Sequence, residues 1–258
     1  MSRKQTRASF EEADAALEKT LNELDEHVPN YNEWVRTLIS PAAVGRTLEL
    51  GAGLGTFTPA LLQTADHVVA VEPSERGHAA LVEQTRHNPR VSAVLGYALD
   101  ATTLSPFDGA VLSNVLEHID DDEGTLKELF SLLRPGGRVA VFSPAFALLM
   151  SDFDRSIGHV RRYRKRDLCA RFERAGFEIV DARYVNMPGF FAWLVVTRLF
   201  HKRPTNSRLS SFYDRAVVPS TRWIESHVRP PFGQSILVIG QKPNEPERTD
   251  RPDTGRGA

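Results

Sequence analysis

The feature that most constrains this chain is a short apolar strand that runs directly into a turn with three glycines, TLELGAGLGT at residues 47–56. Gly51 allows the chain to reverse tightly at the strand end, and Gly53 removes the Cβ that would block a ligand. Gly55 lets the following helix begin close to the sheet. The turn therefore predicts an open α/β sheet that binds a nucleotide-type cofactor at this strand end, with a generic α/β turn as the alternative.

Two acids near this turn indicate which cofactor it holds. Glu49 precedes the first glycine, and Thr56 occupies the position where a dinucleotide turn would have its last glycine. S-adenosylmethionine (SAM) carries an ammonium and a sulfonium group and no phosphate, so a carboxylate suits it better than a bare helix N-terminus. A second apolar strand, VVAVEPS at 68–74, ends in Glu72, about twenty residues after the turn, which is the spacing of a ribose-binding acid. An exposed strand-end acid is the alternative for Glu72.

Two further apolar segments are interpreted as strands that end in polar residues. The segment VSAVLGYALD, residues 91–100, ends in Asp100, whose carboxylate is a candidate acceptor for an adenine amino group beside the backbone N–H of Ala101. The segment FDGAVLSNV, residues 107–115, runs into LEHIDD. Ligands of open α/β sheets bind outside the carboxyl ends of the strands, so these polar ends are expected to face one crevice.

In combination, these motifs resemble class I SAM-dependent methyltransferases, in particular the small bacterial enzymes of type 11/12. The resemblance covers roughly residues 30–185 and rests on the glycine turn, the Glu72 and Asp100 strands, FDGAVLSNVLEHI and LLRPGGRVAVFSP in family order. It implies a Rossmann-like fold with a seven-stranded, mostly parallel sheet, an antiparallel last strand and a helical cap. The cofactor residues that it implies are Glu49, Gly51, Ala52, Gly53 and Gly55 for the methionine part, Glu72 and Pro73 for the ribose, Asp100 and Ala101 for the adenine, Asn114 for the methionyl backbone, and Tyr31, which closes over the cofactor.

Tyr31 has a second interpretation, because it belongs to the segment NYNEWV at 30–35. Aromatic residues dominate protein cores, so ordinary packing of Tyr31 and Trp34 is an equal alternative to a role in cofactor binding.

Composition agrees with one α/β unit that carries appendages. The chain has 258 residues, of which 41% are apolar and 25% charged, so a sizeable core can be buried. The net charge of −1 provides no electrostatic footprint for nucleic acid, and we expect no nucleic-acid partner. The single cysteine, Cys169, excludes an internal disulfide framework and fits a reducing cytoplasm. No apolar signal-peptide segment is present near the N-terminus, so we expect a cytoplasmic protein.

Hydrophobic periodicity and turn signals divide the chain into five parts. They predict last strands at 177–185 and 235–242, which the resemblance implies form an antiparallel pair. The parts are a helical N-terminal cap at 1–35, a SAM-binding core at 36–185 and 235–242, a lid within the core at 144–165, a helical cap insertion at 186–234, and a disordered tail at 243–258.

The lid contains the motif GHVRRY and the first candidate for a catalytic residue, His159. Methyl transfer to oxygen usually requires a base, and histidine has the most suitable unperturbed pKa. The alternative is that the motif orders the lid through ion pairs from its arginines to Asp152 or Asp154. A third interpretation is that the protein only aligns the two reactants and that the reaction uses no base.

His118 stands beside an acidic run, Asp120, Asp121 and Asp122, but we predict no metal site. The acidic run is explained as favourable charge at a helix N-terminus. No set of spaced carboxylates and amides suited to Mg²⁺ is evident.

The cap insertion begins NMPGFFAWLVVTRLFHKR, in which the nearly apolar run 190–200 is too short to span a bilayer. The aromatic and basic residues of 190–203 are typical of an interfacial helix, which predicts a peripheral membrane contact. Packing over the acceptor pocket, or against a second subunit in a homodimer, is the alternative. Either arrangement favours a small-molecule acceptor that is partly hydrophobic or linked to a lipid or glycan.

The sequence therefore predicts SAM-dependent methyl transfer to an oxygen atom. A SAM-binding protein of the same fold that does not methylate, either pericyclase-like or a sensor, is the alternative from another class, because fold does not determine function. Nitrogen and carbon acceptors remain open. A nicotinamide oxidoreductase is disfavoured by Thr56 and by the lack of a second nucleotide-binding half.

Overall fold

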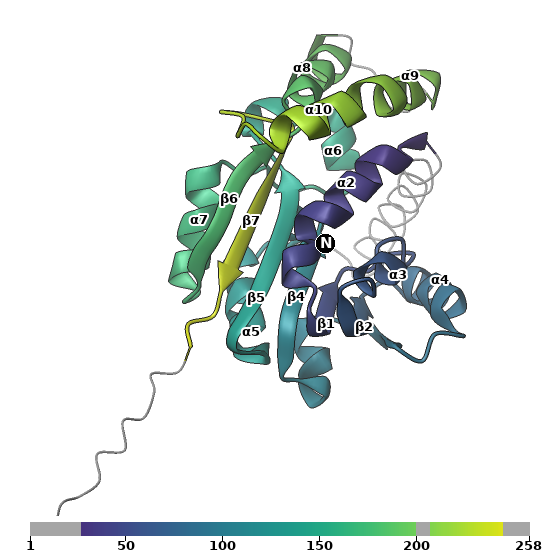
Figure 1. The fold of residues 1–258 in the computed structure, drawn as a ribbon, viewed down its shortest axis with the longest axis vertical. Helices are drawn as coiled ribbons and strands as arrows, with labels where there is room; N and C mark the ends of the chain where they lie inside the picture. Colours follow the sequence, from purple (N-terminus) through teal and green to yellow (C-terminus); the bar gives the residue numbers. More distant parts are fainter. Residues whose placement is uncertain (1–26, 200–206, 245–258) are drawn as a thin grey trace, which may run out of the picture.

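The protein is built on one seven-stranded sheet in the order β3-β2-β1-β4-β5-β7-β6. The structure, a computed structural model, describes residues 27–199 and 207–244 (Figure 1). Strand β7 runs antiparallel to both of its neighbours, and the other pairs are parallel, which confirms the predicted mostly parallel sheet with an antiparallel last strand. The strands are β1 Gly45–Leu50, β2 Ala65–Glu72, β3 Val91–Leu95, β4 Phe107–Ser113, β5 Leu133–Pro144, β6 Glu178–Val185 and β7 Ser235–Gln241.

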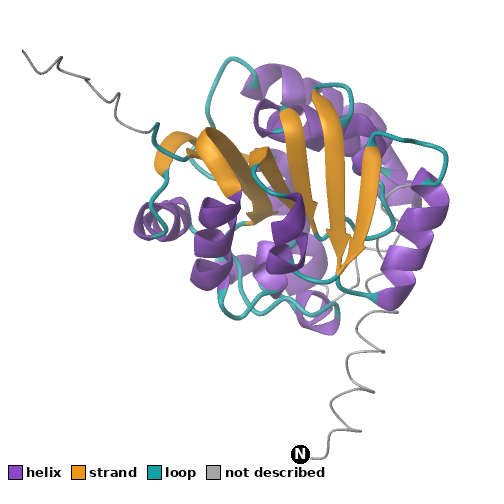
Figure 2. Cartoon of the chain, turned by 90° about the horizontal axis from the view of Figure 1, so that it is seen from below, coloured by secondary structure: helices purple, strands orange, loops and turns teal. Residues whose placement is uncertain are grey.

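Helices cover both faces of the sheet, as Figure 2 shows. One face carries α5 and α7, and the other carries α2, α3 and α4. The described α-helices are α2 Pro29–Ile39, α3 Thr58–Leu61, α4 Glu75–Thr85, α5 Asp122–Leu132, α6 Asp152–Ser156, α7 Lys165–Arg174, α8 Met187–Trp193, α9 Ser207–Phe212 and α10 Val218–Glu225.

The parallel strands are apolar on both faces because each face supports its own core. In β2, Val69 and Val71 pack with α5 and α7, whereas Val68 and Ala70 pack with the helices of the opposite face. All four side chains are fully buried. Successive residues of a strand point to opposite faces, so a strand covered on both sides reads as a continuous apolar run.

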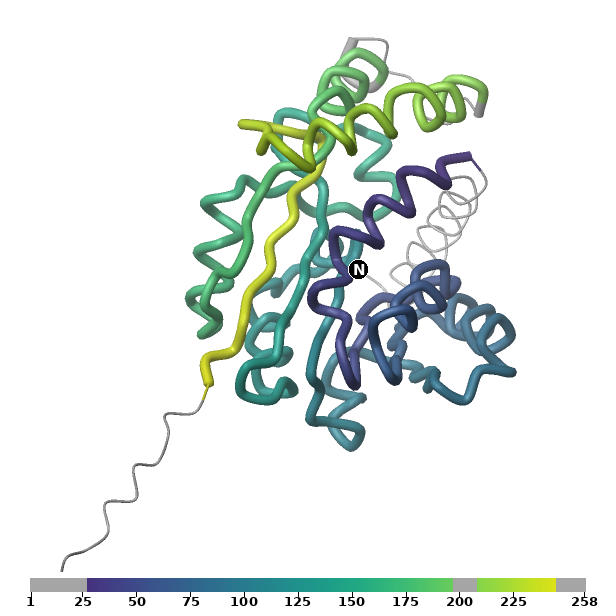
Figure 3. Tube along the Cα trace, in the orientation of Figure 1, coloured from purple at the N-terminus to yellow at the C-terminus, as the bar shows by residue number. Residues whose placement is uncertain are grey.

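The order of the strands reverses beside β1, whose neighbours are β2 and β4. The glycine turn leaves β1 at this point, and ligands of open α/β sheets bind at such switch points. The cap insertion leaves the sheet after Val185 and returns at Ser235, which pairs with Pro144 at the end of β5. The cap therefore lies over the carboxyl ends of the parallel strands (Figure 1, Figure 3).

The predicted third strand is too long. It was expected to continue to Asp100, but β3 ends at Leu95, and a 3-10 helix occupies Ala98–Leu104. Gly96 has a φ of +147°, and the Asp100 carboxylate accepts a hydrogen bond from the Tyr97 backbone N–H at 2.7 Å. This side-chain capping bond favours the helical turn over an extended chain.

Positions 35 and 36, on either side of the predicted boundary between the N-terminal cap and the core, both lie inside α2. Pro29 occupies the first turn of α2, where its missing N–H does no harm. Positions 1–26 of the predicted helical cap and most of the tail predicted at 243–258 lie outside the described residues.

Candidate functional site

The glycine turn has a geometry that only glycine can adopt without strain. Gly51 has a φ of +72°, and a Cβ there would collide with the Val115 side chain. The backbone N–H groups of Gly51 and Ala52 both donate to the Val71 carbonyl, at 2.8 and 3.0 Å. These bonds hold the turn against the end of β2. A larger side chain at position 51 would both displace Val115 and force an unfavourable backbone.

Glu49 is a buried carboxylate at the end of β1, with 5% of its surface exposed. Its partner is the hydroxyl of Thr58, which donates to Oε2 at 2.6 Å. Burial raises the pKa of Glu49 to about 7, because the bond from Thr58 compensates only part of the lost hydration. A cationic group placed beside this carboxylate would favour its ionised form, so the position suits the positive charges of SAM.

Glu72 lies beside the glycine turn, as the sequence predicts. Its two carboxylate oxygens accept hydrogen bonds from the backbone N–H groups of Gly53 at 2.8 Å and Ser74 at 2.9 Å. Pro73, between Glu72 and Ser74, is exposed. The structure therefore brings the end of β2 and the turn after β1 together at one edge of the sheet.

The predicted adenine and methionyl residues lie at the same edge on other strands. Asp100 is exposed in the 3-10 helix after β3, and the neighbouring Ala101 is fully buried. Asn114 follows β4, has a left-handed φ of +55° and donates its backbone N–H to the Phe142 carbonyl at 2.8 Å. Asparagine tolerates this conformation better than most residues.

Tyr31 is both a packed aromatic residue and a neighbour of the site. Its ring contacts Trp34 and Phe142 edge to face, with centroids 6.4 Å apart in each pair. Its hydroxyl lies 3.3 Å from Ser235 Oγ at the start of β7. Burial raises the pKa of Tyr31 to about 12, so the hydroxyl stays protonated. The packing alternative is therefore present, and the hydroxyl still lies at the carboxyl edge of the sheet.

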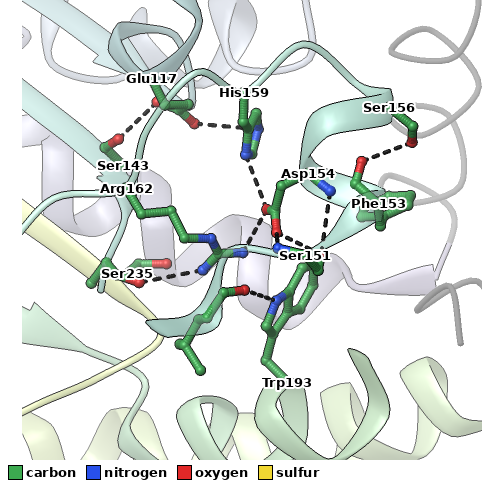
Figure 4. A network of polar contacts seen from close by, with 12 residues as sticks. Glu117, Ser143, Ser151, Phe153, Asp154, Ser156, His159, Arg162, Trp193 and Ser235 are labelled. Carbon is green, nitrogen blue, oxygen red and sulfur yellow. Dashed lines mark hydrogen bonds and ion pairs between the residues drawn. The ribbon is translucent and has the colours of Figure 1, made fainter. Parts of the chain in front are cut away.

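A second group of polar side chains lies over the ends of β4 and β5, and we call it the His159 cluster. His159 Nδ1 is 3.1 Å from Asp154 Oδ1, and its Nε2 is 3.9 Å from Glu117 Oε1 (Figure 4). Asp154 is fixed by Arg162, whose Nη2 lies 2.6 Å from the same Oδ1. The cluster consists of Glu117, His118, Asp154, His159 and Arg162.

Asp154 carries a negative charge inside this cluster. Burial alone would raise its pKa, but the hydrogen bond from His159, the charge of Arg162 and the Ser151 hydroxyl together lower it to about 2. An ionised Asp154 accepts the Nδ1 proton of a neutral His159 ring. The lone pair of Nε2 then points toward Glu117.

Glu117 is the least satisfied member of the cluster. It is fully buried, and burial raises the pKa of its carboxyl group. Its Oε2 accepts a hydrogen bond from the Ser143 hydroxyl at 2.8 Å. Its Oε1 has no hydrogen-bond partner among the described residues.

His118 stacks edge to face on His159, with ring centroids 4.7 Å apart and an interplanar angle of 84°. Burial, followed by the charge of His159, lowers the pKa of His118 to about 4. His118 is therefore a neutral imidazole at pH 7. The acids expected after it lie elsewhere, because Asp122 pairs with Arg161 at 2.6 Å and Arg171 at 2.9 Å.

One of the ion pairs expected from the GHVRRY arginines is present, because Arg162 pairs with Asp154. Arg161 pairs with Asp122 instead, and Asp152 pairs with Arg155, which lies outside the motif, at 3.4 Å. The Arg162–Asp154 pair orders the lid and also orients His159. The role of His159 as a base stays a prediction.

Sequence reasoning missed several residues that the structure brings to the site. Glu117 belongs to the His159 cluster, and Ser143 donates a hydrogen bond to it. Ser113 Oγ at the end of β4 is buried without a hydrogen-bond partner in the described part of the chain. Asp214 of the cap binds the start of α2. A signal for Glu117 existed, because it directly precedes His118, but a long-range partner such as Asp214 leaves no local pattern.

The cap packs on the lid and also exposes apolar side chains. Trp193 Nε1 donates to the Leu149 carbonyl at 3.0 Å, and the Arg162 guanidinium lies 5.0 Å from the Trp193 ring centroid. Phe212 and Trp223 are 65% and 69% exposed. Among the described helices, none combines the length and the apolar character needed to cross a bilayer.

A comparison with protein families and curated proteins points to one family. A family model described as a methyltransferase domain matches residues 24–182. A demethylmenaquinone methyltransferase of Clavibacter sepedonicus is 32% identical over 160 residues, which covers 58% of this chain and 63% of that protein. The chain thus spans less than two thirds of that relative.

Solved structures share the fold at low sequence identity. An N-methyltransferase, NodS from Bradyrhizobium japonicum in complex with S-adenosyl-L-homocysteine, has a TM-score of 0.53 and 16% identity, and the match covers 82% of this chain and 85% of that chain. The [4+2]-cyclase SpnF has a TM-score of 0.56 and 20% identity, with 83% of this chain and 81% of that chain covered. Both confirm the Rossmann-like architecture.

Proposed function

The chain belongs to the methyltransferase domain family, and we propose that it transfers the methyl group of SAM to an oxygen atom of a partly hydrophobic small molecule. The cofactor residues are those of the glycine turn and the strand ends, and the acceptor lies at the His159 cluster. The observation that carries the oxygen assignment is the His159 ring, which Asp154 orients over the ends of β4 and β5.

The residues of the first half of the sheet fit SAM. Glu49 is a buried carboxylate that a cationic neighbour would keep ionised, and Gly51 gives the turn beside it a backbone conformation for which Val115 leaves no room for a Cβ. Glu72 lies against Gly53, where a carboxylate can exchange its backbone partners for ribose hydroxyls. The cofactor, when bound, supplies a methyl group on a sulfonium, which is the electrophile of the reaction.

The second half of the sheet supplies the groups that act on the acceptor. A neutral His159 keeps its proton on Nδ1, so Nε2 can receive the proton of an acceptor hydroxyl. Asp154 then stabilises the imidazolium, because its own pKa is low.

The alternatives differ in what becomes of the cofactor. A SAM-binding protein that does not methylate, either pericyclase-like or a sensor, would bind SAM and release it unchanged. The similarity in fold to a [4+2]-cyclase keeps this alternative in view. Transfer to nitrogen or carbon would still produce S-adenosylhomocysteine, and would be identified from the methylated product.

The test has two stages. Calorimetric titration with SAM and, separately, with NADH should give binding of SAM alone. Conversion of SAM to S-adenosylhomocysteine should then depend on an added acceptor. Absence of SAM binding refutes the proposal, and binding without turnover across hydroxylated, amino and carbon acceptors favours the alternative class.

The cap supports a proposal that the reaction takes place at a membrane surface. Its exposed face combines apolar side chains, among them Phe191, Phe212 and Trp223, with exposed arginines such as Arg208 and Arg215. This combination suits the interface of an anionic membrane on the cytoplasmic side, from which a hydrophobic acceptor of secondary metabolism could be drawn. Contact through 190–203 is part of this proposal, although positions 200–203 lie outside the described residues. A homodimer that buries the same face is the competing arrangement.

A further inference from the structure

Three side chains of the His159 cluster, from two separate segments of the chain, present one ligand atom each to a common point. The atoms offered by Glu117, His118 and His159 all lie within 4.8 Å of one another. We propose that these three residues bind a divalent transition-metal cation of the Zn²⁺ type.

The first support is the unsatisfied oxygen of Glu117. Glu117 Oε1 is buried, has no hydrogen-bond partner among the described residues, and lies 3.9 Å from His159 Nε2. A buried polar atom without a partner destabilises the fold, because the atom has lost its hydrogen bonds to water and gained none in return. When His159 is neutral, two electron-pair donors face each other across this distance, and only a proton or a cation between them makes the contact favourable.

The spacing is close to that of two ligands of one metal ion. Ligands bound at about 2.1 Å in a tetrahedral site are about 3.4 Å apart, so Glu117 Oε1 and His159 Nε2 need to approach by roughly half an ångström. A direct hydrogen bond would require a similar approach, to within about 3.2 Å, so the distance fits both arrangements and the unpartnered oxygen and the second imidazole favour the cation.

The second support is that the His159 imidazole already has the outer partner that ligating histidines use. Its Nδ1 bonds to Asp154, which Arg162 and the Ser151 hydroxyl hold in place. Metal-bound histidines commonly donate their other N–H to a carboxylate or to a backbone carbonyl.

The donor types select the class of cation. Two imidazoles and one carboxylate suit Zn²⁺, Co²⁺ or Fe²⁺, whereas Mg²⁺ and Ca²⁺ prefer oxygen ligands. Three protein ligands leave at least one position for a further ligand, as in catalytic zinc sites.

The sequence prediction of no metal considered His118 only with the aspartates that follow it. In the structure, Asp122 is instead bound by Arg161 and Arg171. His159, which belongs to the lid, packs its ring against the His118 ring. The ligand set therefore depends on a contact between β4 and the lid, which no local spacing reveals.

The role of the cation rests on the proposed function. A cation at this position would bind the acceptor oxygen and lower its pKa. The O–H bond breaks, the proton passes to solvent water, and the electron pair stays on the oxygen. That oxygen then bonds to the methyl carbon of SAM while the S–CH3 bond breaks and its electron pair stays on the sulfur of S-adenosylhomocysteine. In the cation-loaded protein His159 is a ligand and receives no proton, so cation binding and general-base catalysis by His159 are alternative ways to activate one acceptor.

Cation binding can be measured without SAM or acceptor. Protein purified without a polyhistidine tag and treated with a chelator is titrated with Zn²⁺ by calorimetry, and with Co²⁺ by visible absorption. We expect one cation per chain and the absorption bands of low-coordinate Co²⁺, with no competition from excess Mg²⁺.

The variants Glu117→Gln and His118→Asn should each weaken binding by at least about tenfold. His87→Asn, which changes an exposed histidine away from the cluster, should leave it unchanged. Circular dichroism and thermal melting establish that each variant is folded. The proposal is overturned if the wild-type protein binds no cation, or if folded Glu117→Gln and His118→Asn bind it as tightly as the wild type. A chain that binds the cation but not SAM would refute only the proposed function.

Discussion

Several single side chains of this protein are held in states that their free amino acids would not adopt. Burial makes Glu49 and Glu117 harder to ionise, whereas Arg162 and His159 keep Asp154 ionised in an equally enclosed position. The difference lies in partners rather than in depth, since only Asp154 has a cation bonded to it.

Gly53 is the residue at which a single substitution should remove the cofactor. Its φ is +56°, which a β-branched residue rarely adopts, and its N–H lies against Glu72. Gly53→Val is expected to abolish SAM binding in calorimetry. Gly136→Val is the matched control, because Gly136 also has a positive φ, +79°, but lies at the opposite end of the sheet. That variant should lose stability and retain SAM affinity; equal SAM affinity in Gly53→Val would contradict the assignment of the turn.

His159→Ala tests the acceptor half of the site. We expect kcat to fall by roughly 10²–10⁴-fold, the usual contribution of a positioned base, while the Kd for SAM stays nearly unchanged. Arg155→Ala removes an exposed ion pair of the same lid and should leave kcat as it is. Full activity of His159→Ala would exclude this residue from both routes of acceptor activation.

At this scale the positions of the strand-end residues are easier to predict from the sequence than the contacts of the His159 cluster. Gly51, Glu49 and Glu72 follow local rules, because a strand end and a turn determine their positions. Glu117 and Ser143 meet only after β4 and β5 have paired. Their contact depends on register across the sheet, which a single sequence does not display.

Among the elements, the cap is connected to the pre-sheet helix by one carboxylate. Asp214, fully buried in the segment between α9 and α10, accepts hydrogen bonds from the backbone N–H groups of Asn30 at 3.1 Å and Tyr31 at 2.8 Å. These donors belong to the first turn of α2, where helix N–H groups lack partners within the helix. Asp214 thereby caps α2, although the two are separated in sequence by more than half of the chain.

Asp214→Asn should lower the free energy of unfolding by about 1–3 kcal/mol. The side-chain amide of asparagine has one acceptor oxygen instead of two, and it has no negative charge to interact favourably with the helix dipole. Urea unfolding followed by circular dichroism measures this difference. Asp152→Asn, at a carboxylate that is 98% exposed, should stay within about 0.5 kcal/mol of the wild type. Equal stability of both variants would show that the cap does not anchor α2.

The exposed aromatic and arginine side chains of the cap predict binding to anionic membranes. Co-sedimentation with vesicles that contain phosphatidylglycerol should exceed that with phosphatidylcholine alone, because the exposed arginines add electrostatic attraction. A double variant, Phe212→Ser and Trp223→Ser, should reduce sedimentation severalfold. Tyr97→Ser changes an equally exposed aromatic residue outside the cap and should have no effect. Loss of dimers in the double variant, with no vesicle binding by the wild type, would favour the homodimer instead.

The molecule as a whole follows the sequence closely in its sheet. Alternating strand and helix signals predict the parallel strands, and the resemblance implies the antiparallel last strand that β7 provides. The end of β3 and the boundary at 35 and 36 could not be placed, since capping by Asp100 and packing of α2 decide them. The arrangement of α8, α9 and α10 was predicted only as helical, because their contacts are long-range.

The stability of the whole protein should depend on pH through Glu49. Its pKa rises from 4.5 to about 7 on folding, so the folded state binds this proton more tightly than the unfolded state. Relative to Glu49→Gln, the wild type should lose about 3 kcal/mol of stability as the pH rises from about 4.5 to above 7, because the buried group must then ionise. Urea unfolding of both proteins across this range measures the difference. Saturating SAM should reduce the loss, and a pH-independent difference would contradict the assignment.

The insertion that forms the cap leaves the sheet at Val185 and rejoins it at Ser235, two residues that pair with each other on adjacent strands. The ends of the insertion are therefore neighbours, and the sheet can close whatever lies between them. Such an arrangement makes residues 186–234 an exchangeable cassette, so that relatives could acquire new acceptors by replacing this segment alone. A chimaera that carries the corresponding segment of a homologue would keep this protein's cofactor affinity and take on the homologue's choice of substrate.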